Sequence, residues 1–543
     1  MQVVSGPTAK QLLDLSWEST DSATIGGRDV MPDPAYRVAW MIAAIVVAAY
    51  GIVFLQFAPP ALQDYPNHLA RALVMSDLLF HGGARFGATF QYSFIAVPYI
   101  LNDLLLASAI ELFDVKIAAS AWSLLVLLSL PCALLFFMRV AKIRREDQIF
   151  AFLLSLYLAT NTFYLRGFLA FSLAVAVIVA VLALVRLFRE RPSPALFAVY
   201  CTVLGLGYLI HLTTLIFATA AIAVSSALKA WCRTANVRTE VLIFLPIVAL
   251  LIWHFAVPHP VPGLVVSIGY YSGTLIGKIR NLDWNFIRFT PRTDRWMLWL
   301  CIACVLWQAR HLRSRGAITT PHVIAMFASA ATFLGIYVVL PLNLAGTTWV
   351  DVRALPMIAI FVIMAALAPV DADRLPKGTL GTTLGLLATA LLAAANLAYV
   401  NAHLYRIDAW LTEYRAVVAA VPSGAWVFPV YTNTLDRPIK STLHAAAFTV
   451  IDRGAPNPYL FSADMGHPMV YFKYRRKPYA PVEVWYVEPT TEDVNWQAIA
   501  GSYDFLLVMK PFDPTRIQIS TTPIFENAAA ALLAIDSRRL SAR

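Results

Sequence analysis

The hydrophobic positions along this chain fall into long uninterrupted runs that fit membrane-spanning helices. A helix needs about 20 apolar residues to cross the hydrocarbon, and it satisfies its own backbone hydrogen bonds while doing so. The pattern therefore predicts about eleven spans, at residues 38–58, 117–138, 148–165, 167–185, 195–210, 212–228, 241–257, 296–309, 322–340, 354–370 and 379–400.

The segments between the runs differ in charge, and this difference predicts the topology. Short connections rich in Lys and Arg stay in the cytoplasm. The N-terminal segment 1–36 is then cytoplasmic too, and the other face receives the loops 59–116 and 258–295 and everything after residue 400. The basic connections hold Arg139, Lys142, Arg144 and Arg145; Arg186, Arg189 and Arg191; Lys229, Arg233 and Arg238; Arg310, Arg313 and Arg315; and Arg374 and Lys377.

The first apolar run is of full length and follows a mixed polar segment. It therefore predicts a retained anchor rather than a cleaved signal. We expect a multi-pass protein of the cell inner (plasma) membrane. Its membrane domain covers 37–400, and the C-terminal domain lies on the extracytoplasmic, periplasmic side.

One apolar stretch, VPYILNDLLLASAIELF, is predicted not to cross the bilayer. It contains Asn102, Asp103 and Glu111, and a span here would turn the basic segment RVAKIRRED outward, against the positive-inside rule. We interpret it as an interfacial or re-entrant helix.

After residue 400 the pattern becomes that of a water-exposed domain. A helix is predicted around RIDAWLTEYRAVVAAV, followed by a PSG turn, the strand-like WVFPVY, and a helix-like WQAIAGSYD that leads into FLLVMK. This alternation predicts a small α/β domain over residues 401–543. The expected fold class is thus an α-helical polytopic membrane protein with a C-terminal α/β domain.

Composition narrows the function classes. The chain is 59% hydrophobic and only 14% charged, which excludes an ordinary soluble domain. Its net charge of +10 comes mostly from the basic connections, so topology explains that charge and no nucleic-acid partner is predicted. The CxxC pair Cys301 and Cys304 lies within an apolar run without a second pair, which disfavours a metal or redox site.

The first outward loop carries the strongest candidate chemistry. In QDYPNHLAR, the residues Asp64, His68 and Arg71 are spaced by four and three, so they share one face of a helix. A carboxylate here can act as general base toward a hydroxyl, while nearby cations hold a phosphate leaving group. The alternative is an interfacial loop whose charges are merely solvated.

Other polar residues on the same face would complete a pocket. Arg166 follows an aromatic segment, His211 interrupts a long uncharged stretch, and Asp351 and Arg353 stand where a span begins. Ionisable groups at such positions are costly unless they are paired or hydrated. The alternatives are a snorkelling Arg166, a solvated turn residue at His211 and a local ion pair between Asp351 and Arg353.

Two further segments combine aromatic with basic residues. They suit lipid headgroups or a sugar phosphate, and interfacial anchoring explains them equally well. They are the loop 258–295, with Tyr270, Tyr271, Lys278, Arg280, Asp283, Trp284, Arg288, Arg292 and Arg295, and the C-terminal stretch with Lys473, Arg475, Arg476 and Lys477.

In layout and in three motifs the chain resembles the C-type superfamily of integral-membrane glycosyltransferases. Asp64 matches the acidic residue of the first outward loop, VPYILNDLLLASAIELFD resembles the juxtamembrane segment before the second span, and the element from Arg353 to Pro356 resembles a late Arg-x-Leu-Pro motif. The resemblance implies transfer of a sugar from a polyprenyl-phosphate carrier to a glycan, lipid or protein acceptor outside the cytoplasm, in contact with membrane lipids. Asp64 would be the general base, and Arg353 would neutralise the departing phosphate.

Cofactors and competing functions stay open. The loop has no DxD motif, yet Asp64 and Asp103 together could hold a divalent metal ion. A polysaccharide polymerase or ligase is one alternative, although such proteins often carry large outward loops between late spans. A lipid-linked glycan transporter is another, although ionisable residues deep in several helices would be expected there, and His254 is a rare case.

Overall fold

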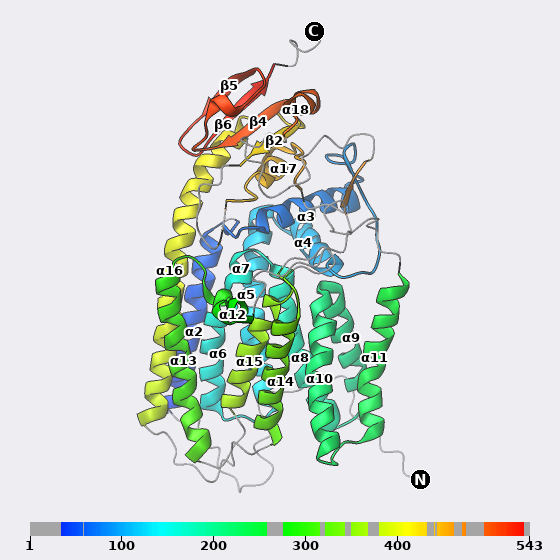
Figure 1. The fold of residues 1–543 in the computed structure, drawn as a ribbon, viewed down its shortest axis with the longest axis vertical. Helices are drawn as coiled ribbons and strands as arrows, with labels where there is room; N and C mark the ends of the chain where they lie inside the picture. The colour runs from blue at the N-terminus through cyan, green and yellow to red at the C-terminus, as the bar shows by residue number, and fades with distance from the viewer. Residues whose placement is uncertain are drawn as a thin grey trace.

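The computed structural model describes residues 34–536 apart from 58, 258–274, 315–320, 343–348, 368–379, 432–438, 440–441, 461–469 and 474–493. Several residues named above therefore lie outside the described residues: Tyr270, Tyr271, Arg315, Arg374, Lys377, Arg475, Arg476, Lys477 and residues 1–33. Long helices run side by side in a bundle, and a smaller α/β region sits on one end of it (Figure 1).

A described helix lies over each of the eleven predicted runs. They are α2 (Pro34–Gln56), α5 (Val115–Val140), α6 (Arg145–Ala159), α8 (Leu169–Glu190), α9 (Pro194–Ile210), α10 (Leu212–Trp231), α11 (Val237–Ala256), α13 (Pro291–Ser314), α14 (Pro321–Val339), α15 (Leu355–Ala366) and α16 (Leu380–Ala419).

Seven of these described helices are long and apolar enough to cross a membrane: α2, α5, α8, α10, α11, α14 and α16. α9 and α15 are apolar but shorter, whereas α13 extends well beyond the short run predicted for it. The chain is a multi-pass membrane protein of mainly helical fold, and the number of spans stays a prediction.

Two helices lie across one end of the bundle instead of within it. These are α3 (Tyr65–Phe80) and α4 (Ile100–Leu112), and we call this end of the bundle the α3 end (Figure 1). With 13 residues α4 is about 20 Å long, too short for a hydrocarbon layer of about 30 Å. The connections α5–α6, α8–α9 and α10–α11, which carry basic clusters, lie at the opposite end.

α16 links the bundle to the C-terminal region. The sequence predicted a span ending near residue 400 and a separate helix after it, but the described helix continues unbroken to Ala419 and leaves the bundle at the α3 end (Figure 1). The absence of Gly and Pro between residues 386 and 419 permits this continuity.

The C-terminal region contains a four-stranded sheet of order β2-β4-β6-β5. β2 runs parallel to β4, and the other two pairs are antiparallel. The predicted strand WVFPVY is present as β2 and the predicted helix WQAIAGSYD as α18, and the segment FLLVMK that follows it forms β4. The elements are β2 (Val427–Val430), α17 (Ala447–Arg453), α18 (Trp496–Ser502), β4 (Phe505–Met509), β5 (Thr521–Glu526) and β6 (Ala530–Ile535).

The C-terminal region and the first loop share a second sheet, which the sequence did not predict. β1 (Phe90–Tyr92) from the loop pairs antiparallel with β3 (Val470–Phe472), so that Phe90 lies opposite Phe472. α17 packs on α3 beside this sheet. The first loop and the C-terminal region thus form one structure over the α3 end.

Candidate active site at the α3 end

Asp64 stands at the N-cap position of α3 but does not cap the helix with its side chain. Only its backbone carbonyl accepts from the first turn, from the N–H groups of Asn67 (3.1 Å) and His68 (3.2 Å). Its Oδ1 instead accepts from Gln63 Nε2 at 3.1 Å and lies 3.5 Å from His444 Nε2. A carboxylate at a helix start often caps that helix, whereas this one faces Gln63 and His444.

The turn at residues 165–167 holds the backbone of Asp64 in place. The Asp64 N–H donates to the carbonyl of Arg166 at 2.9 Å, and the Gln63 N–H donates to that of Leu165 at 3.2 Å. Gly167 has a φ of +81°, and a Cβ there would lie 2.6 Å from the Tyr65 nitrogen. Only glycine fits both this conformation and this close approach.

Arg166 packs against two neighbouring indole rings. Its guanidinium carbon is 4.3 Å from the ring centroid of Trp349 and 5.1 Å from that of Trp284. The Thr162 hydroxyl, at the start of α7 (Thr162–Leu165), bonds the Trp284 carbonyl at 3.2 Å. The snorkelling alternative is therefore wrong, because the side chain is buried in the protein by cation–π contacts.

Burial changes the acidity of Asp64. The side chain is 4% exposed, and loss of water raises its pKa from 3.8 to about 7, even though the Gln63 hydrogen bond and the Arg166 charge act in the opposite direction. A carboxyl group with such a pKa can accept a proton near neutral pH and release it again.

His68 and Arg71 share a face of α3, as their spacing predicted. Arg71 Nη2 lies 2.8 Å from both carboxylate oxygens of Asp103 and 3.1 Å from His68 Nδ1. Burial, aided by the positive charge of Arg71, lowers the pKa of His68 well below 6.5. These residues are buried or nearly so, which contradicts the alternative of solvated loop charges.

The pairing with Arg71 bears on the suggested metal ion. Asp103 also accepts from Asn102 Nδ2 at 3.2 Å, so its two oxygens already have strong donors. Among the residues that the structure describes, no group of three or more His, Cys, Asp and Glu side chains is placed to hold a metal. The geometry thus gives Asp103 the role of a partner for Arg71.

Arg353 belongs to a second cluster at the same end of the bundle. Its Nη1 lies 2.9 Å from His211 Nε2, and its guanidinium carbon lies 5.5 Å from the ring centroid of Phe171. His211 is 3% exposed and its ring contacts Tyr99, so it is not the solvated turn residue that was considered.

The ion pair between Asp351 and Arg353 that was considered as an alternative is replaced by another pair. Asp351 Oδ2 accepts from Lys278 Nζ at 3.0 Å, and Lys278 also donates to the Tyr337 carbonyl at 2.8 Å. Both charged side chains are buried, so the anchor role considered for Lys278 is wrong. Its ammonium therefore compensates the Asp351 carboxylate.

The two clusters meet around the chain from Arg166 to Phe171. Arg166 is bonded to Asp64 through its carbonyl, the Phe168 ring is 5.6 Å from that of Trp349, and Phe171 contacts Arg353. Asp64 and Arg353 thus lie at the same end of the bundle, as the resemblance requires. A cavity lined by both remains a prediction.

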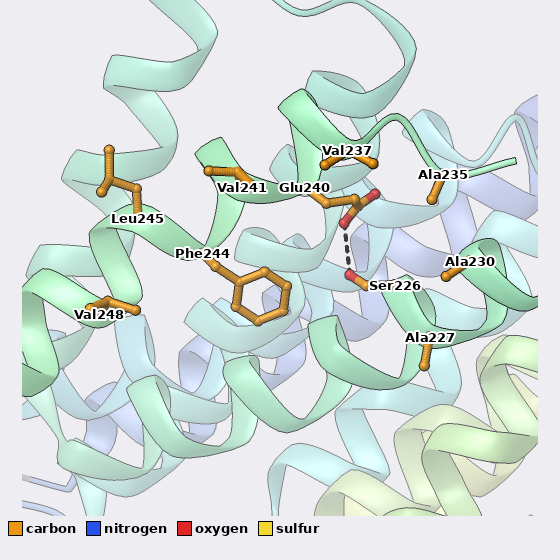
Figure 2. A pocket seen from close by; sticks show the side chains of 10 residues that line it. All are labelled: Ser226, Ala227, Ala230, Ala235, Val237, Glu240, Val241, Phe244, Leu245 and Val248. Atoms are coloured by element: carbon orange, nitrogen blue, oxygen red, sulfur yellow. Dashed lines mark hydrogen bonds between the residues drawn. The ribbon is translucent and has the colours of Figure 1, made fainter.

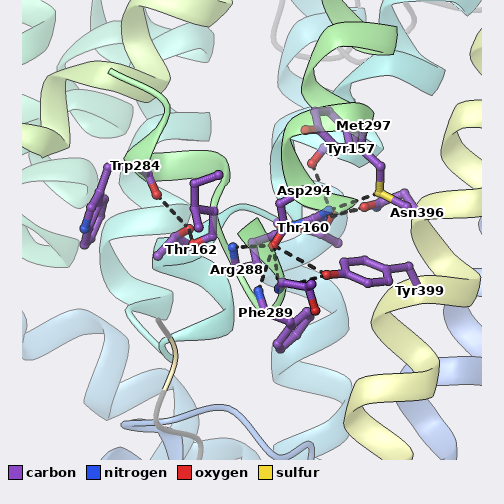
Figure 3. Close-up of polar contacts among 12 residues, drawn as sticks. Tyr157, Thr160, Thr162, Trp284, Arg288, Phe289, Asp294, Met297, Asn396 and Tyr399 are labelled. Atoms are coloured by element: carbon purple, nitrogen blue, oxygen red, sulfur yellow. Dashed lines mark hydrogen bonds and ion pairs between the residues drawn. The ribbon is translucent and has the colours of Figure 1, made fainter. Parts of the chain in front are cut away.

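Sequence reasoning missed two parts of this arrangement. His444 and Asn67 are 377 positions apart, and nothing in the segment STLHAAAF distinguishes His444. Arg288 was considered an interfacial residue, but it is 1% exposed and pairs with Asp294 at 2.9 Å. Figure 3 shows this pair among Tyr157, Asn396 and Tyr399.

A described cavity of about 570 Å³ lies away from this site. It is a groove between α10 and α11, lined mostly by apolar side chains such as Phe244 and Leu245, near the end opposite α3 (Figure 2). Its polar part is Ser226 and Glu240, and Glu240 is bonded to Arg189. The groove therefore adds nothing to the chemistry at Asp64.

No protein-family model and no curated protein sequence matches the chain. Among solved structures it resembles ArnT from Cupriavidus metallidurans in the apo state, with a TM-score of 0.53, 12% identity and coverage of 92% of this chain and 98% of ArnT. Arabinofuranosyltransferase AftD from Mycobacteria aligns with a TM-score of 0.44 and 14% identity over 92% of this chain and 40% of AftD. This likeness shows that the chain shares the fold of ArnT.

Proposed function

We propose that the chain is a membrane glycosyltransferase. It moves a sugar from a polyprenyl-phosphate carrier to a glycan, lipid or protein acceptor on the non-cytoplasmic face. The observation that carries this proposal is the buried Asp64 carboxyl, which does not cap its helix and lies in the part of the fold where the resemblance requires a base. The ArnT-like fold agrees with this reaction class.

The proposed reaction uses Asp64 as general base. As the acceptor hydroxyl oxygen forms its bond to the anomeric carbon, its proton passes to the Asp64 carboxylate. The bond from the anomeric carbon to the carrier phosphate breaks, and the phosphate leaves with the electron pair. A pKa near 7 supports this role, because about half of the carboxyl groups are then ionised at pH 7 and the carboxylate is basic enough to take a proton.

Arg353 is proposed to neutralise the departing phosphate. Its Nη1 lies 2.9 Å from His211 Nε2, at the end of the bundle that also holds Asp64. A guanidinium presents a planar fork of N–H donors that can bind two phosphate oxygens at once. Arg166 adds positive charge next to Asp64.

The test is a transfer assay with the purified chain. Given a radiolabelled polyprenyl-phosphate sugar and membrane acceptors, the wild type should release free carrier and label an acceptor. Asp64→Asn should abolish both. Glu111→Gln is the matched control, because it removes a partly exposed carboxylate on α4 that is bonded to His81. An unchanged rate in Asp64→Asn would remove the proposed base.

Two other outcomes identify the competing functions. Carrier-linked sugar that crosses a vesicle without covalent change would identify a transporter. Transfer of whole oligosaccharides, with single sugars rejected, would identify a polymerase or ligase.

A further inference from the structure

The C-terminal region reaches α3 through a side chain whose orientation is chemically fixed. Asn67 Nδ2 lies 2.8 Å from the carbonyl oxygen of Tyr459. A carbonyl can only accept a hydrogen bond, so the amide nitrogen of Asn67, and not its oxygen, must face this oxygen. Both groups are buried, and the contact joins the first loop to a segment 392 positions further along the chain.

This orientation determines the tautomer of His444. The same Asn67 Nδ2 lies 3.3 Å from His444 Nδ1. Because Asn67 offers a proton there, Nδ1 must present its lone pair, and the single proton of a neutral ring is then on Nε2. Burial lowers the pKa of His444 to about 3, so the ring is neutral at physiological pH. Nε2 lies 3.5 Å from Asp64 Oδ1.

We infer that His444 is a positioning residue that directs its Nε2–H toward Asp64 Oδ1, so that the C-terminal region completes the active site. The inference rests on the proposed function, in which Asp64 is the base. The order of contacts is Tyr459 carbonyl, Asn67 amide, His444 ring and Asp64 carboxylate. Each step fixes the direction of the next donor, as in catalytic sites where a neutral partner orients a histidine or a carboxylate.

The C-terminal region is held firmly enough to provide such a residue. His444 lies in the turn before α17, which packs on α3. The Arg85 guanidinium donates to the carbonyls of Val450 and Ile451 at 3.3 Å each, and β1 pairs with β3. These contacts restrict how far His444 can move from Asp64.

The other groups around Asp64 come from three elements. Gln63 precedes α3 and donates to Oδ1, Arg166 lies before α8 and contributes positive charge, and His68 and Arg71 follow on α3. A substitution at His444 changes none of these. A shift in the titration of Asp64 would then report on the His444 contact itself.

Two substitutions of His444 test whether this residue acts as a hydrogen-bond donor or only fills space. His444→Gln places an amide N–H near the position of Nε2, whereas His444→Asn reaches only the position of Nδ1. The full-length chain in detergent, without substrate, is titrated by infrared spectroscopy of the protonated carboxyl band, assigned through Asp64→Asn. His444→Asn removes a hydrogen-bond donor to the ionised Asp64 carboxylate, so the midpoint of the Asp64 titration should rise by about 0.5 to 1 pH unit. His444→Gln keeps the donor, so its midpoint should change little.

Equal midpoints in wild type, His444→Gln and His444→Asn would overturn the inference. If His444→Asn does not fold, His444→Leu supplies a second variant of similar bulk without a donor, for which the same upward shift is expected. Melting curves of the variants identify misfolding separately from the titration.

The transfer assay distinguishes failure of this inference from failure of the proposed function. We expect His444→Asn to lower the transfer rate by about 10- to 100-fold and to move the acid limb of its pH profile upward, with His444→Gln within about threefold of wild type. If Asp64→Asn abolishes transfer while both His444 variants behave as wild type, only the positioning role fails. If Asp64→Asn retains transfer, the proposed function itself fails.

Discussion

Asp64 is the residue whose ionisation should control the reaction. Its pKa is raised to about 7 mainly by burial, so the carboxyl is protonated in acid and ionised above neutrality. A general base works only in its ionised form. We therefore expect kcat/KM to rise about tenfold per pH unit below 7 and to level off above it. A pH profile of sugar transfer measures this, and a rate already at its plateau at pH 5 would contradict it.

The same group should make folding depend on pH. In the unfolded chain the carboxyl has its ordinary pKa of 3.8, so the folded state binds more protons between pH 4 and 7 and loses stability as the pH rises. Asp64→Asn removes this cost. Relative to wild type, it should gain up to about 4 kcal/mol at pH 8 and little at pH 4. Thermal unfolding at the two pH values measures the difference, and a gain that is the same at both would refute this origin.

Gly167 is expected to be intolerant of any side chain. Its φ is positive, and a Cβ added there would approach the Tyr65 nitrogen to 2.6 Å, so Gly167→Ala must displace the start of α3, and Asp64 with it. We expect a destabilisation of about 1 to 3 kcal/mol and at least about a tenfold loss of transfer.

Gly205→Ala is the matched control for this prediction. It lies within α9, and a Cβ there meets nothing within 4 Å. Alanine is the better helix former, so this variant should be neutral or stabilised by up to about 1 kcal/mol. Equal losses in the two variants would show that the close approach at Gly167 is unimportant.

At the scale of elements, the sequence located the helices but not their polar contacts. The bilayer requires long apolar runs, and this requirement can be recognised in the sequence without knowledge of neighbouring helices. Arg288 shows the limit. Beside Trp284 and Arg292 it has the appearance of an interfacial anchor. Its partner Asp294 is only six residues away, but Asn396 becomes a neighbour only when α13 packs on α16.

The pair of Arg288 and Asp294 joins three elements. Arg288 donates to Asn396 of α16 at 2.5 Å and to the carbonyl of Thr160 after α6 at 3.3 Å, while Asp294 begins α13 (Figure 3). The loop fixed in this way carries Trp284, which contacts Arg166. The ion pair therefore supports the site indirectly, through Trp284 and Arg166.

Arg288→Ala should be strongly destabilising, because it leaves the fully buried Asp294 without its cation. We expect a loss of about 3 to 5 kcal/mol. Arg295→Ala breaks the pair with Asp283 in the same loop, but Arg295 is 57% exposed, and less than about 1 kcal/mol is expected. Unfolding curves of both variants provide the comparison, and similar losses would mean that burial of the Arg288 pair is unimportant.

At the scale of the whole molecule, the site depends on contacts that no local pattern encodes. Asp64, His68 and Arg71 could be selected from their spacing on one helix. Lys278 and Asp351 are 73 positions apart, and His444 and Asp64 are further apart still. The resemblance could indicate where a base and a phosphate-binding arginine belong, but not which charges are neutralised by other parts of the fold.

The orientation of the whole molecule is the remaining prediction, and two exposed positions test it. Thr234 lies in the basic turn between α10 and α11, whereas Thr412 lies on the part of α16 beyond the bundle at the α3 end. The positive-inside rule places the basic turn in the cytoplasm. In a chain whose five cysteines are replaced, a membrane-impermeant maleimide should therefore label Thr412→Cys in intact cells and Thr234→Cys only after permeabilisation. Because Asp64 and Arg353 share the α3 end with Thr412, the reverse labelling would place the site in the cytoplasm and exclude transfer on the outer face.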